Sequence, residues 1–456
     1  MAHWQQGETL ELAITDLSSA GDGVGRWENR VVFVPDTVPG DRVQVRLLQA
    51  KPAFGRGKLL QVLEPSGDRI RPACIVADKC GGCQWQPVAY TAQLAAKEQQ
   101  LLDALKRIGG LADVVVNPIL RADHPLDYRN KATYPLGQSA ENTVKAGYFR
   151  KGTHQIVNLN QCPVQDHRLN PLLAEIKQDI QKQGWPIYNE ATQKGALRHL
   201  ALRIGRRTGQ MLLTLVSTTW ELPGLEDQCG QWKERYPELV GVCINRNPKS
   251  GNAIWGKETR YVLGQPYLEE RFAALMFRIY PTTFFQVYTE QAERLLRIML
   301  EELQLQGDEI VVDAYSGVGT LTLPVAQRAE YCLGLEVQEE AVEMANENAK
   351  LNGIRNVRFQ VGTVAKLLPN VTASLRDQAP DIVLLDPPRK GCGEQTLQTL
   401  IALHPQRIVY MSCNPATLAR DLKQLCGEGA YHLKRVQPAD FFPQTAHVEC
   451  VAFLVA

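Results

Sequence analysis

The chain lacks the kinds of segment that would direct it to a membrane or a secretory route. No stretch reaches the roughly 18 apolar residues that a membrane-spanning helix needs. Its start, MAHWQQGETLEL, has neither the basic nor the apolar region of a signal peptide. We therefore expect a cytoplasmic protein that does not enter a membrane.

Internal repeats and low-complexity tracts are also missing, and 22% charged against 44% hydrophobic residues is ordinary globular composition. At 456 residues the chain is too long for one hydrophobic core, so we expect several domains. An even set of cysteines is absent. Eleven cysteines without a secretion signal favour reduced thiols, metal ligands or catalysis over a disulfide framework.

A strong net charge is absent, since the formal charge is +1, but the charges are unevenly spread. Between Arg42 and Arg71 seven Lys/Arg stand against two Asp/Glu, and between Arg121 and Gln210 fourteen stand against seven. From residue 301 onward thirteen basic residues face nineteen acidic ones. The basic part is the candidate for contact with a polyanion, and the acidic part for holding a small cofactor.

Three regions differ in their pattern of apolar residues. Residues 8–63 form short alternating runs separated by Gly and Pro, which predicts a small OB-like β-barrel. Residues 91–107 have a helical period, and the stretch from 118 to 280 mixes strand-like and helical runs. After Pro281 strands and helices alternate, which predicts an α/β, Rossmann-like domain with a parallel, doubly wound sheet. The expected domains are the barrel at 1–66, a central mixed α+β domain at 67–280 and the Rossmann-like domain at 281–456.

The alternation after Pro281 also predicts where a ligand binds, because open α/β sheets hold ligands beyond the carboxyl ends of their strands. Five expected helices cover 288–303, 320–329, 338–351, 394–402 and 415–426. Six expected strands cover 309–314, 331–336, 357–362, 381–386, 407–413 and 447–456. The residues that follow these strands are the first candidates for a site.

The sequence EIVVDAYSGVGTLTL places a buried strand before a tight turn that contains Gly317 and Gly319, and then a helix. Glu336 ends the next strand, where a carboxylate can accept hydrogen bonds from both hydroxyls of a ribose. A third glycine for a pyrophosphate and a P-loop lysine are absent, which favours S-adenosylmethionine over NAD or ATP. Asp386, followed by two prolines, ends another strand at the same edge. A packing turn and a solvated strand end are the alternatives.

Two residues near the end of the chain indicate covalent catalysis. Cys413 follows the strand RIVYMS and precedes a helix that begins near Pro415, and the positive end of a helix can lower the pKa of a thiol. Glu449 lies within an apolar final strand, where burial should raise its pKa and suit it to act as a base. An inert buried cysteine and a structural ion pair are the alternatives. The cysteines without such a setting are Cys229, Cys243, Cys332, Cys392, Cys426 and Cys450.

A second group of cysteines has the spacing of metal ligands. Cys74, Cys80 and Cys83 form a Cx5Cx2C motif, and Cys162 stands in NQCPV downstream. Four such thiolates can hold zinc or an iron–sulfur cluster, and the spacing does not choose between them. Four ordinary buried cysteines are the third reading.

In these residues the chain resembles the RNA 5-methyluridine methyltransferases, and among them the 23S ribosomal RNA (uracil-5-)-methyltransferases. The cysteine motif is followed in the family's order by FFQVY, DAYSGVGTLTL, DPPRKG, SCNPATLARD and HVEC, and the barrel resembles a TRAM domain. The resemblance implies methyl transfer from S-adenosylmethionine to carbon 5 of a flipped uridine in RNA. Cys413 would attack carbon 6, and Glu449 would remove the proton from carbon 5.

The resemblance also implies a [4Fe-4S] cluster on the four cysteines and residues that line the cofactor site. The implied lining residues are Gln286, Tyr315, Thr320, Glu336, Thr363 and Asp386. The motifs depart from the commoner family pattern where Tyr288 and Thr363 replace Asn, and where Tyr315, Ser316 and Thr320 replace Phe, Cys and Asn. Arg129, Asn130 and Lys131 are candidate phosphate contacts, with a solvated charged face as the alternative. We expect a monomer that binds RNA.

Three other functions compete with this one. Transfer RNA is an alternative substrate for the same chemistry. An amino-group methyltransferase would also carry a DPP motif, but Arg389 stands where such an enzyme would have an aromatic residue to clamp the base. A non-catalytic RNA-binding or iron–sulfur assembly protein has no need to keep both Cys413 and Glu449.

Overall fold

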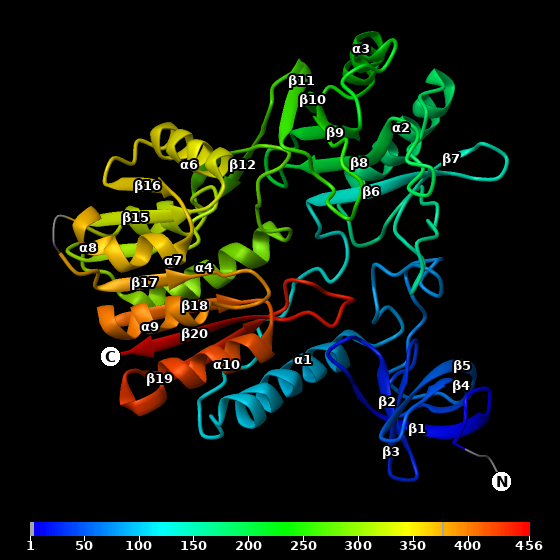
Figure 1. The fold of residues 1–456 in the computed structure, drawn as a ribbon, viewed down its shortest axis with the longest axis horizontal. Coiled ribbons are helices and arrows are strands. Elements are labelled where there is room, and N and C mark those ends of the chain that lie inside the picture. Colours follow the sequence, from blue (N-terminus) through cyan, green and yellow to red (C-terminus); the bar gives the residue numbers. More distant parts are fainter. Residues whose placement is uncertain (1–3, 376–377) are drawn as a thin grey trace.

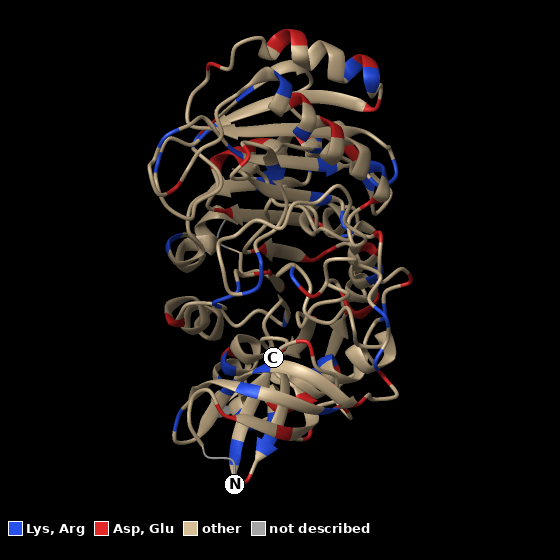
Figure 2. Cartoon of the chain, turned by 90° about the vertical axis from the view of Figure 1, so that its right-hand side faces the viewer, with Lys and Arg blue, Asp and Glu red and all other residues tan. Residues whose placement is uncertain are grey.

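The computed structural model describes residues 4–375 and 378–456. It contains a closed five-stranded barrel, a six-stranded central sheet and a seven-stranded sheet with helices on both faces (Figure 1). Lys and Arg are spread over the strands of the barrel and the strands and loops of the central sheet on the side shown in Figure 2. The barrel and the Rossmann-like sheet confirm the fold that the sequence predicts.

The barrel forms because its strands alternate between core and solvent, as β1 does with its inward Leu10, Leu12 and Ile14. The strands pair in the order β1-β2-β3-β5-β4. They are β1 (Thr9–Leu17), β2 (Gly23–Trp27), β3 (Arg30–Val34), β4 (Arg42–Ala50) and β5 (Phe54–Glu64).

The central sheet has the order β11-β10-β9-β8-β6-β7. Every residue of β9 is buried, so this strand is the middle of the layer. The strands are β6 (Lys131–Gln138), β7 (Val144–Ala146), β8 (Leu197–Ile204), β9 (Met211–Ser217), β10 (Leu239–Arg246) and β11 (Glu258–Gly264). Its helices are η2 (His167–Leu169), α2 (Asn170–Gln183) and α3 (Leu225–Arg235).

The seven-stranded sheet has the order β16-β15-β14-β17-β18-β20-β19, and apolar clusters fill both of its faces. The strands are β14 (Ile310–Asp313), β15 (Tyr331–Glu336), β16 (Val357–Val361), β17 (Ile382–Leu385), β18 (Arg407–Ser412), β19 (His432–Ala439) and β20 (Glu449–Val455). The helices are α4 (Thr289–Leu303), α5 (Thr322–Ala326), α6 (Glu339–Leu351), α7 (Val364–Leu367), η3 (Leu368–Asn370), α8 (Val371–Ser374), α9 (Glu394–Leu403), α10 (Pro415–Leu425) and η4 (Gly427–Gly429).

Two expectations for this sheet are wrong in detail. The sheet is not parallel throughout, because β20 runs antiparallel to both β18 and β19, and β19 was not expected from its charged sequence HLKRVQPA. The helix expected at 320–329 is only α5, since turns occupy the residues before Thr322 and after Gln327. The antiparallel direction of β20 matters for the site described below.

Two segments outside the last 176 residues pack against the seven-stranded sheet. The hairpin of β12 (Leu268–Phe272) and β13 (Leu275–Ile279) shares an apolar cluster with α4. Helix α1 (Tyr90–Ala104) and the π-turn η1 (Leu105–Gly109) lie against α10. The domain boundaries named above stay a prediction. None of the described helices is long and apolar enough to cross a membrane.

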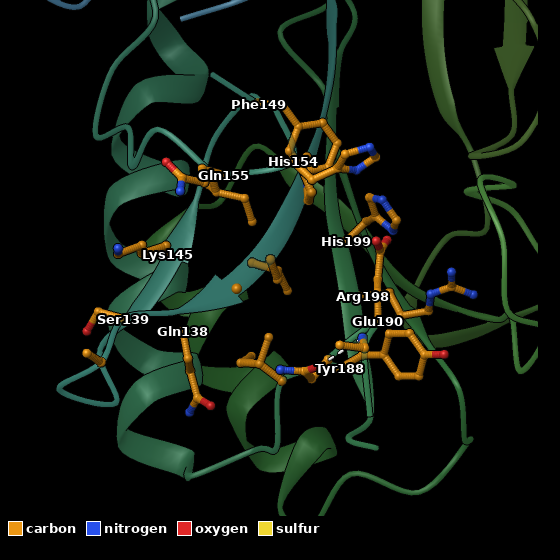
Figure 3. A pocket seen from close by; sticks show the side chains of 18 residues that line it. Gln138, Ser139, Lys145, Phe149, His154, Gln155, Tyr188, Glu190, Arg198 and His199 are labelled. Atoms are coloured by element: carbon orange, nitrogen blue, oxygen red, sulfur yellow. Dashed lines mark hydrogen bonds between the residues drawn. The ribbon is translucent and has the colours of Figure 1, made fainter. Parts of the chain in front are cut away.

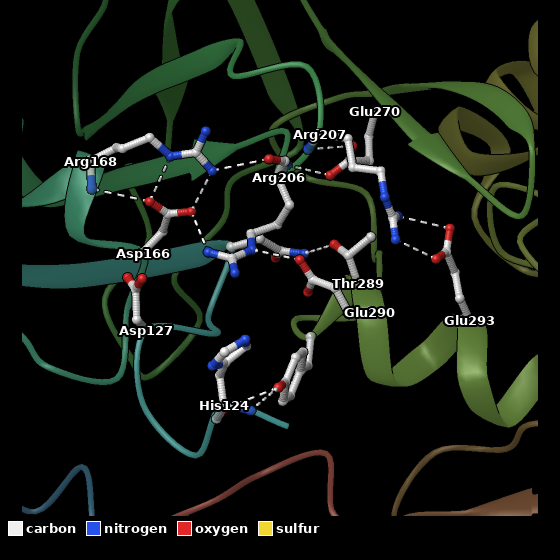
Figure 4. Close-up of polar contacts among 12 residues, drawn as sticks. His124, Asp127, Asp166, Arg168, Arg206, Arg207, Glu270, Thr289, Glu290 and Glu293 are labelled. Carbon is white, nitrogen blue, oxygen red and sulfur yellow. Dashed lines mark hydrogen bonds and ion pairs between the residues drawn. The ribbon is translucent and has the colours of Figure 1, made fainter. Parts of the chain in front are cut away.

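Arginines tie the central sheet to helix α4 (Figure 4). The guanidinium of Arg206 bonds the buried carboxylate of Asp166 and also Glu290, whose Oε1 lies 3.1 Å from the Arg206 Nε. Its neighbour Arg207 pairs with Glu293 one turn further along α4. Because Glu290 and Glu293 lie at the start of α4, the pairs fix this helix relative to the central sheet.

Candidate active site

The direction of β20 brings the two candidate catalytic residues together. Strand β18 ends at Ser412, which is paired with Cys450 in the antiparallel neighbour β20. Cys413 is the next residue of the one chain segment and Glu449 the preceding residue of the other, so they meet at one edge of the sheet. This edge is the carboxyl end of the parallel strands, as expected.

A turn that follows β17 adds a carboxyl group and a guanidinium cation to this point. Asp386 and Arg389 both lie close enough to Cys413 and Glu449 to influence their pKa values. The carbonyl of Arg389 accepts hydrogen bonds from Asn414 Nδ2 (3.2 Å) and Thr417 Oγ1 (3.3 Å), which ties the turn to the start of α10. Arg389 was not predicted as a site residue from the sequence, although its place directly after the two prolines was a usable signal.

The pKa of the Cys413 thiol is raised to about 11, chiefly by burial and then by the negative charge of Glu449. The expected lowering of this pKa is therefore wrong, because burial and the carboxylates of Glu449 and Asp386 outweigh the cation of Arg389 and a backbone hydrogen bond. Burial, followed by the charge of Asp386, raises the pKa of Glu449 well above its usual range, as expected. Its Oε1 is buried without a hydrogen-bond partner among the described residues.

The glycine turn after β14 presents polar groups that suit a nucleoside. Gly317 and Gly319 both have positive φ, at 53° and 91°, and a Cβ added at Gly319 would come within 3.0 Å of Leu323. The Gly317 amide donates to the Glu336 carboxylate at 3.1 Å, and each oxygen of this carboxylate keeps a free lone pair for a ribose hydroxyl. The hydroxyl of Ser316 is buried without a partner in the described part of the chain. These features fit S-adenosylmethionine.

A second buried carboxylate lies beside Asp386, at the end of the adjacent strand β14. Burial raises the pKa of Asp313 to about 6 and that of Asp386 to about 7, where the charge of Asp313 adds to the effect of burial. Asp313 accepts hydrogen bonds from Thr322 Oγ1 (2.7 Å) and from the amide of Tyr315 (3.3 Å), so it holds the glycine turn in place. Asp313 was not predicted as a site residue from the sequence, although it ends a buried strand and Asp386 directly follows one.

The remaining candidate cofactor residues are not all close together. Gln286 and Thr320 line one small cavity. The hydroxyl of Tyr315 lies 3.8 Å from the sulfur of Cys392, and its ring packs against the apolar cluster that contains Cys392. Thr363 follows β16 with an exposed side chain that makes no hydrogen bond to another of these residues.

The four cysteines of the second group line one cavity of about 150 Å³. Cys83 lies near the other three, since Cys162, Cys80 and Cys74 each add to the rise that burial causes in its pKa. Among the described residues only Asp127, Asp166 and His167 bring three ligand-type atoms within 4.8 Å of one another, so no three of the cysteine sulfurs do. In that trio Asp166 is already bonded to two arginines.

The other cysteines are free thiols too. Five of the six are buried, and only Cys426 is partly exposed. Cys450 lies close to Cys413 and Glu449, both of which add to the rise that burial causes in its pKa. Burial is the largest influence on the pKa of each of these six thiols and raises it, whereas Cys413 directly follows β18 at the sheet edge.

The three candidate phosphate contacts, Arg129, Asn130 and Lys131, differ in how far contacts within the chain already engage their side chains. The amide nitrogen of Asn130 donates to the carbonyl of Gln286 (2.8 Å) and to Thr289 Oγ1 (3.0 Å), so it joins two segments of the chain. The ammonium of Lys131 lies 5.3 Å from the ring centroid of Trp255, and the Nε of Arg129 donates to the backbone carbonyl of Lys131. Burial, with the charges of Arg203 and Arg129, lowers the pKa of Lys131 well below its usual range, so Arg129 is the stronger candidate for phosphate.

Comparison with known proteins agrees with this geometry. Residues 252–456 match the family described as tRNA (Uracil-5-)-methyltransferase, and residues 3–60 match the TRAM domain. An uncharacterized RNA methyltransferase of Nostoc sp. is 60% identical over 452 residues, which cover 99% of this chain and 97% of the relative. The chain belongs to the RNA uracil-5-methyltransferase family. It is an S-adenosylmethionine-dependent RNA methyltransferase.

More distant members of the family extend over the same length. An uncharacterized RNA methyltransferase of Bacillus cereus is 40% identical over 450 residues, which cover 99% of this chain and 97% of the relative. The tRNA (uracil-54, C5)-methyltransferase of Pyrococcus abyssi, solved in complex with S-adenosyl-L-homocysteine, is 27% identical with a TM-score of 0.76. The match covers 98% of this methyltransferase and 100% of the archaeal chain, so barrel, central sheet and catalytic sheet are shared.

Proposed function

We propose that this methyltransferase converts a uridine of 23S ribosomal RNA to 5-methyluridine through a covalent bond between Cys413 and carbon 6 of the base. The observation that carries the proposal is the meeting of Cys413 with Glu449 and Arg389 at the sheet edge. A nucleophile and a base side by side are what addition and elimination at a pyrimidine require. Resemblance of the motifs favours ribosomal RNA, and the substrate of the Pyrococcus abyssi relative makes transfer RNA the alternative.

Carbon 5 of uracil is a poor nucleophile, so the residues of the site first have to activate it. The Cys413 thiol releases its proton to solvent, and the sulfur of the resulting thiolate bonds carbon 6 while the electrons of the 5,6 double bond move toward the carbonyl oxygen at carbon 4. The guanidinium of Arg389 stabilises the thiolate, since it is the cation that lowers the pKa of Cys413. S-adenosylmethionine supplies the methyl group that carbon 5 then accepts.

Glu449 completes the reaction by restoring the double bond. Its carboxylate takes the proton from carbon 5, the electrons of that bond reform the 5,6 double bond, and the sulfur of Cys413 leaves carbon 6. The raised pKa of Glu449 makes it a stronger base than an exposed carboxylate. The cofactor would be held by the turn at Gly317 and Gly319, with Glu336 on the ribose and Gln286, Thr320 and Asp386 close to it. Tyr315 and Thr363 complete the proposed set.

RNA that contains 5-fluorouridine tests the covalent step, because fluorine at carbon 5 leaves Glu449 no proton to remove. The wild-type enzyme with cofactor should form a complex stable to denaturing electrophoresis, and Cys413→Ala should form none. Cys426→Ala is the matched control, since this thiol lies outside the site. Glu449→Gln should instead accumulate a complex on ordinary RNA. Normal methylation by Cys413→Ala would overturn the nucleophile, and mass analysis of ribosomal and transfer RNA from a deletion strain decides the substrate.

The four-cysteine cavity is proposed to hold a [4Fe-4S] cluster. Zinc, at about 2.3 Å from each sulfur, would draw the sulfurs to within about 3.8 Å of one another. The wider spacing of the thiols and the cavity between them support the larger group. Protein purified without oxygen should contain about four iron atoms per chain and should absorb visible light, as such clusters do. Cys83→Ser should lose the iron, whereas stoichiometric zinc without iron would refute the cluster.

A further inference from the structure

A cavity of about 580 Å³ lies on the central sheet, apart from the catalytic residues and from the four cysteines (Figure 3). Its walls come from β6 and the start of β7, from residues 149–156 and from residues 187–191, and β8 adds Arg198 and His199. No catalytic or metal-ligand candidate lines it.

The walls combine flat rings with hydrogen-bonding groups. The ring of Phe149 is 37% exposed and lies 5.4 Å, centroid to centroid, from the imidazole of His154. His199 has a pKa lowered to about 4, mainly by burial, so its ring is neutral, and its buried Nδ1 has no partner among the described residues. Gln138 and Gln155 also line the cavity (Figure 3). Rings for stacking and amides that both donate and accept are the chemistry of nucleobase recognition.

One side of the cavity is held rigidly. The guanidinium of Arg198 lies 4.8 Å from the ring centroid of Tyr188. The same guanidinium donates to the carbonyls of Asn247, Lys249 and Gly251 at 2.6 to 3.1 Å. Tyr188 is therefore positioned before any ligand arrives, which reduces the entropy lost on binding.

A second hollow adjoins this cavity on the side of residues 81–84. It shares Phe149 and His154 with the cavity and extends past Arg150 to the loop around Gly82 and Gln84. The backbone N–H of Gln84 donates to the backbone carbonyl of Gln444 at 3.1 Å, and Gln444 lies five residues before Glu449 in the sequence. Arg150 is exposed. Neither Arg150 nor Lys145 of the cavity wall forms an ion pair with another described residue.

We propose that the cavity binds an unpaired nucleobase of the substrate RNA, on the strand that runs along the second hollow toward Cys413. Lys145 and Arg150 would contact the neighbouring phosphates. The proposal rests on RNA as the substrate, which family membership gives, and not on which uridine is methylated or on the covalent step.

Removal of the stacking rings tests the proposal. The variant Phe149→Ala/His154→Ala changes two exposed side chains, so it should fold. Its KM and Kd for substrate RNA should rise roughly 5- to 100-fold, as expected for the loss of one stacked base, while kcat at saturating RNA stays within about twofold. The matched control is Tyr261→Ala, which removes a ring that is 66% exposed on β11 of the same sheet but outside the cavity. Unchanged Kd in the cavity variant, or an equal loss in the control, would overturn the site.

RNAs with single abasic positions then locate the base. One abasic position should weaken binding to the wild-type enzyme and cause little further loss with the cavity variant, because both changes remove the same contact. Additive losses at every position would exclude a base in this cavity. Binding is measured without cofactor, so the result is independent of whether Cys413→Ala supports or refutes the proposed chemistry.

Discussion

The surroundings of Cys413 oppose ionisation of its thiol. Burial and Glu449 raise its pKa to about 11, so in the enzyme without ligands the thiol is protonated near neutral pH. Its alkylation rate should therefore rise about tenfold per pH unit between about pH 7 and pH 10, because only the thiolate reacts. Mass spectrometry after iodoacetamide treatment measures this, with Cys413→Ala as the background.

The same experiment separates the causes of the high pKa. In Glu449→Gln the neutral amide removes a negative charge, so the thiolate should form at lower pH and alkylation at pH 8 should be faster than in the wild type. In Arg389→Met the loss of a cation should have the opposite effect. A rate in the wild type that levels off below pH 8 would show that the thiol ionises more readily than its surroundings indicate.

At the scale of elements, helix α1 is unusual because the stripe it buries is partly polar. Gln93 and Lys97 are buried on the same face as Leu101. The ammonium of Lys97 lies 2.6 Å from Asp440 Oδ1, and both side chains are inaccessible to solvent. The pair holds α1 against the loop that precedes Glu449.

Lys97→Met should destabilise the catalytic part of the molecule by about 3–5 kcal/mol, because it leaves the carboxylate of Asp440 buried without its partner. Lys97→Met/Asp440→Leu should recover most of this loss, since the unpaired charge is removed as well. Thermal unfolding followed by calorimetry measures both. If the double variant is as unstable as the single one, packing rather than charge accounts for the effect.

The sequence allowed most elements to be predicted but not how distant elements meet. The glycine turn, Asp386 and Cys413 were found because each directly follows an apolar strand. Strand β19 was missed since charges and a proline interrupt its apolar pattern, and without it the antiparallel direction of β20 could not be inferred. The burial that raises the pKa of Cys413 likewise depends on neighbours from β17 and β20, which no local pattern reveals.

At the scale of the whole molecule, methylation requires that the sheet proposed to face RNA and the sheet proposed to hold the cofactor keep a fixed relation. Arg206 provides one link, since it bonds Asp166 of the central part and Glu290 of α4 (Figure 4). The side-chain amide of Asn130 provides another link. It bonds Gln286, just before α4, and Thr289, the first residue of α4. Both links end within four residues of Gln286 in the sequence, and Gln286 lines the proposed cofactor site.

Arg206→Met should therefore lower kcat/KM for RNA by roughly 10- to 100-fold, because a small shift between the two sheets misplaces the uridine relative to the methyl donor. The Kd for S-adenosylmethionine should stay unchanged, since the glycine turn and Glu336 are untouched. Steady-state kinetics and calorimetric titration measure the two quantities. Arg235→Met is the matched control, because its ion pairs with Glu175 and Asp179 lie within the central part alone. An equal loss of activity in both variants would mean that stability of the central sheet, and not its alignment with α4, limits the reaction.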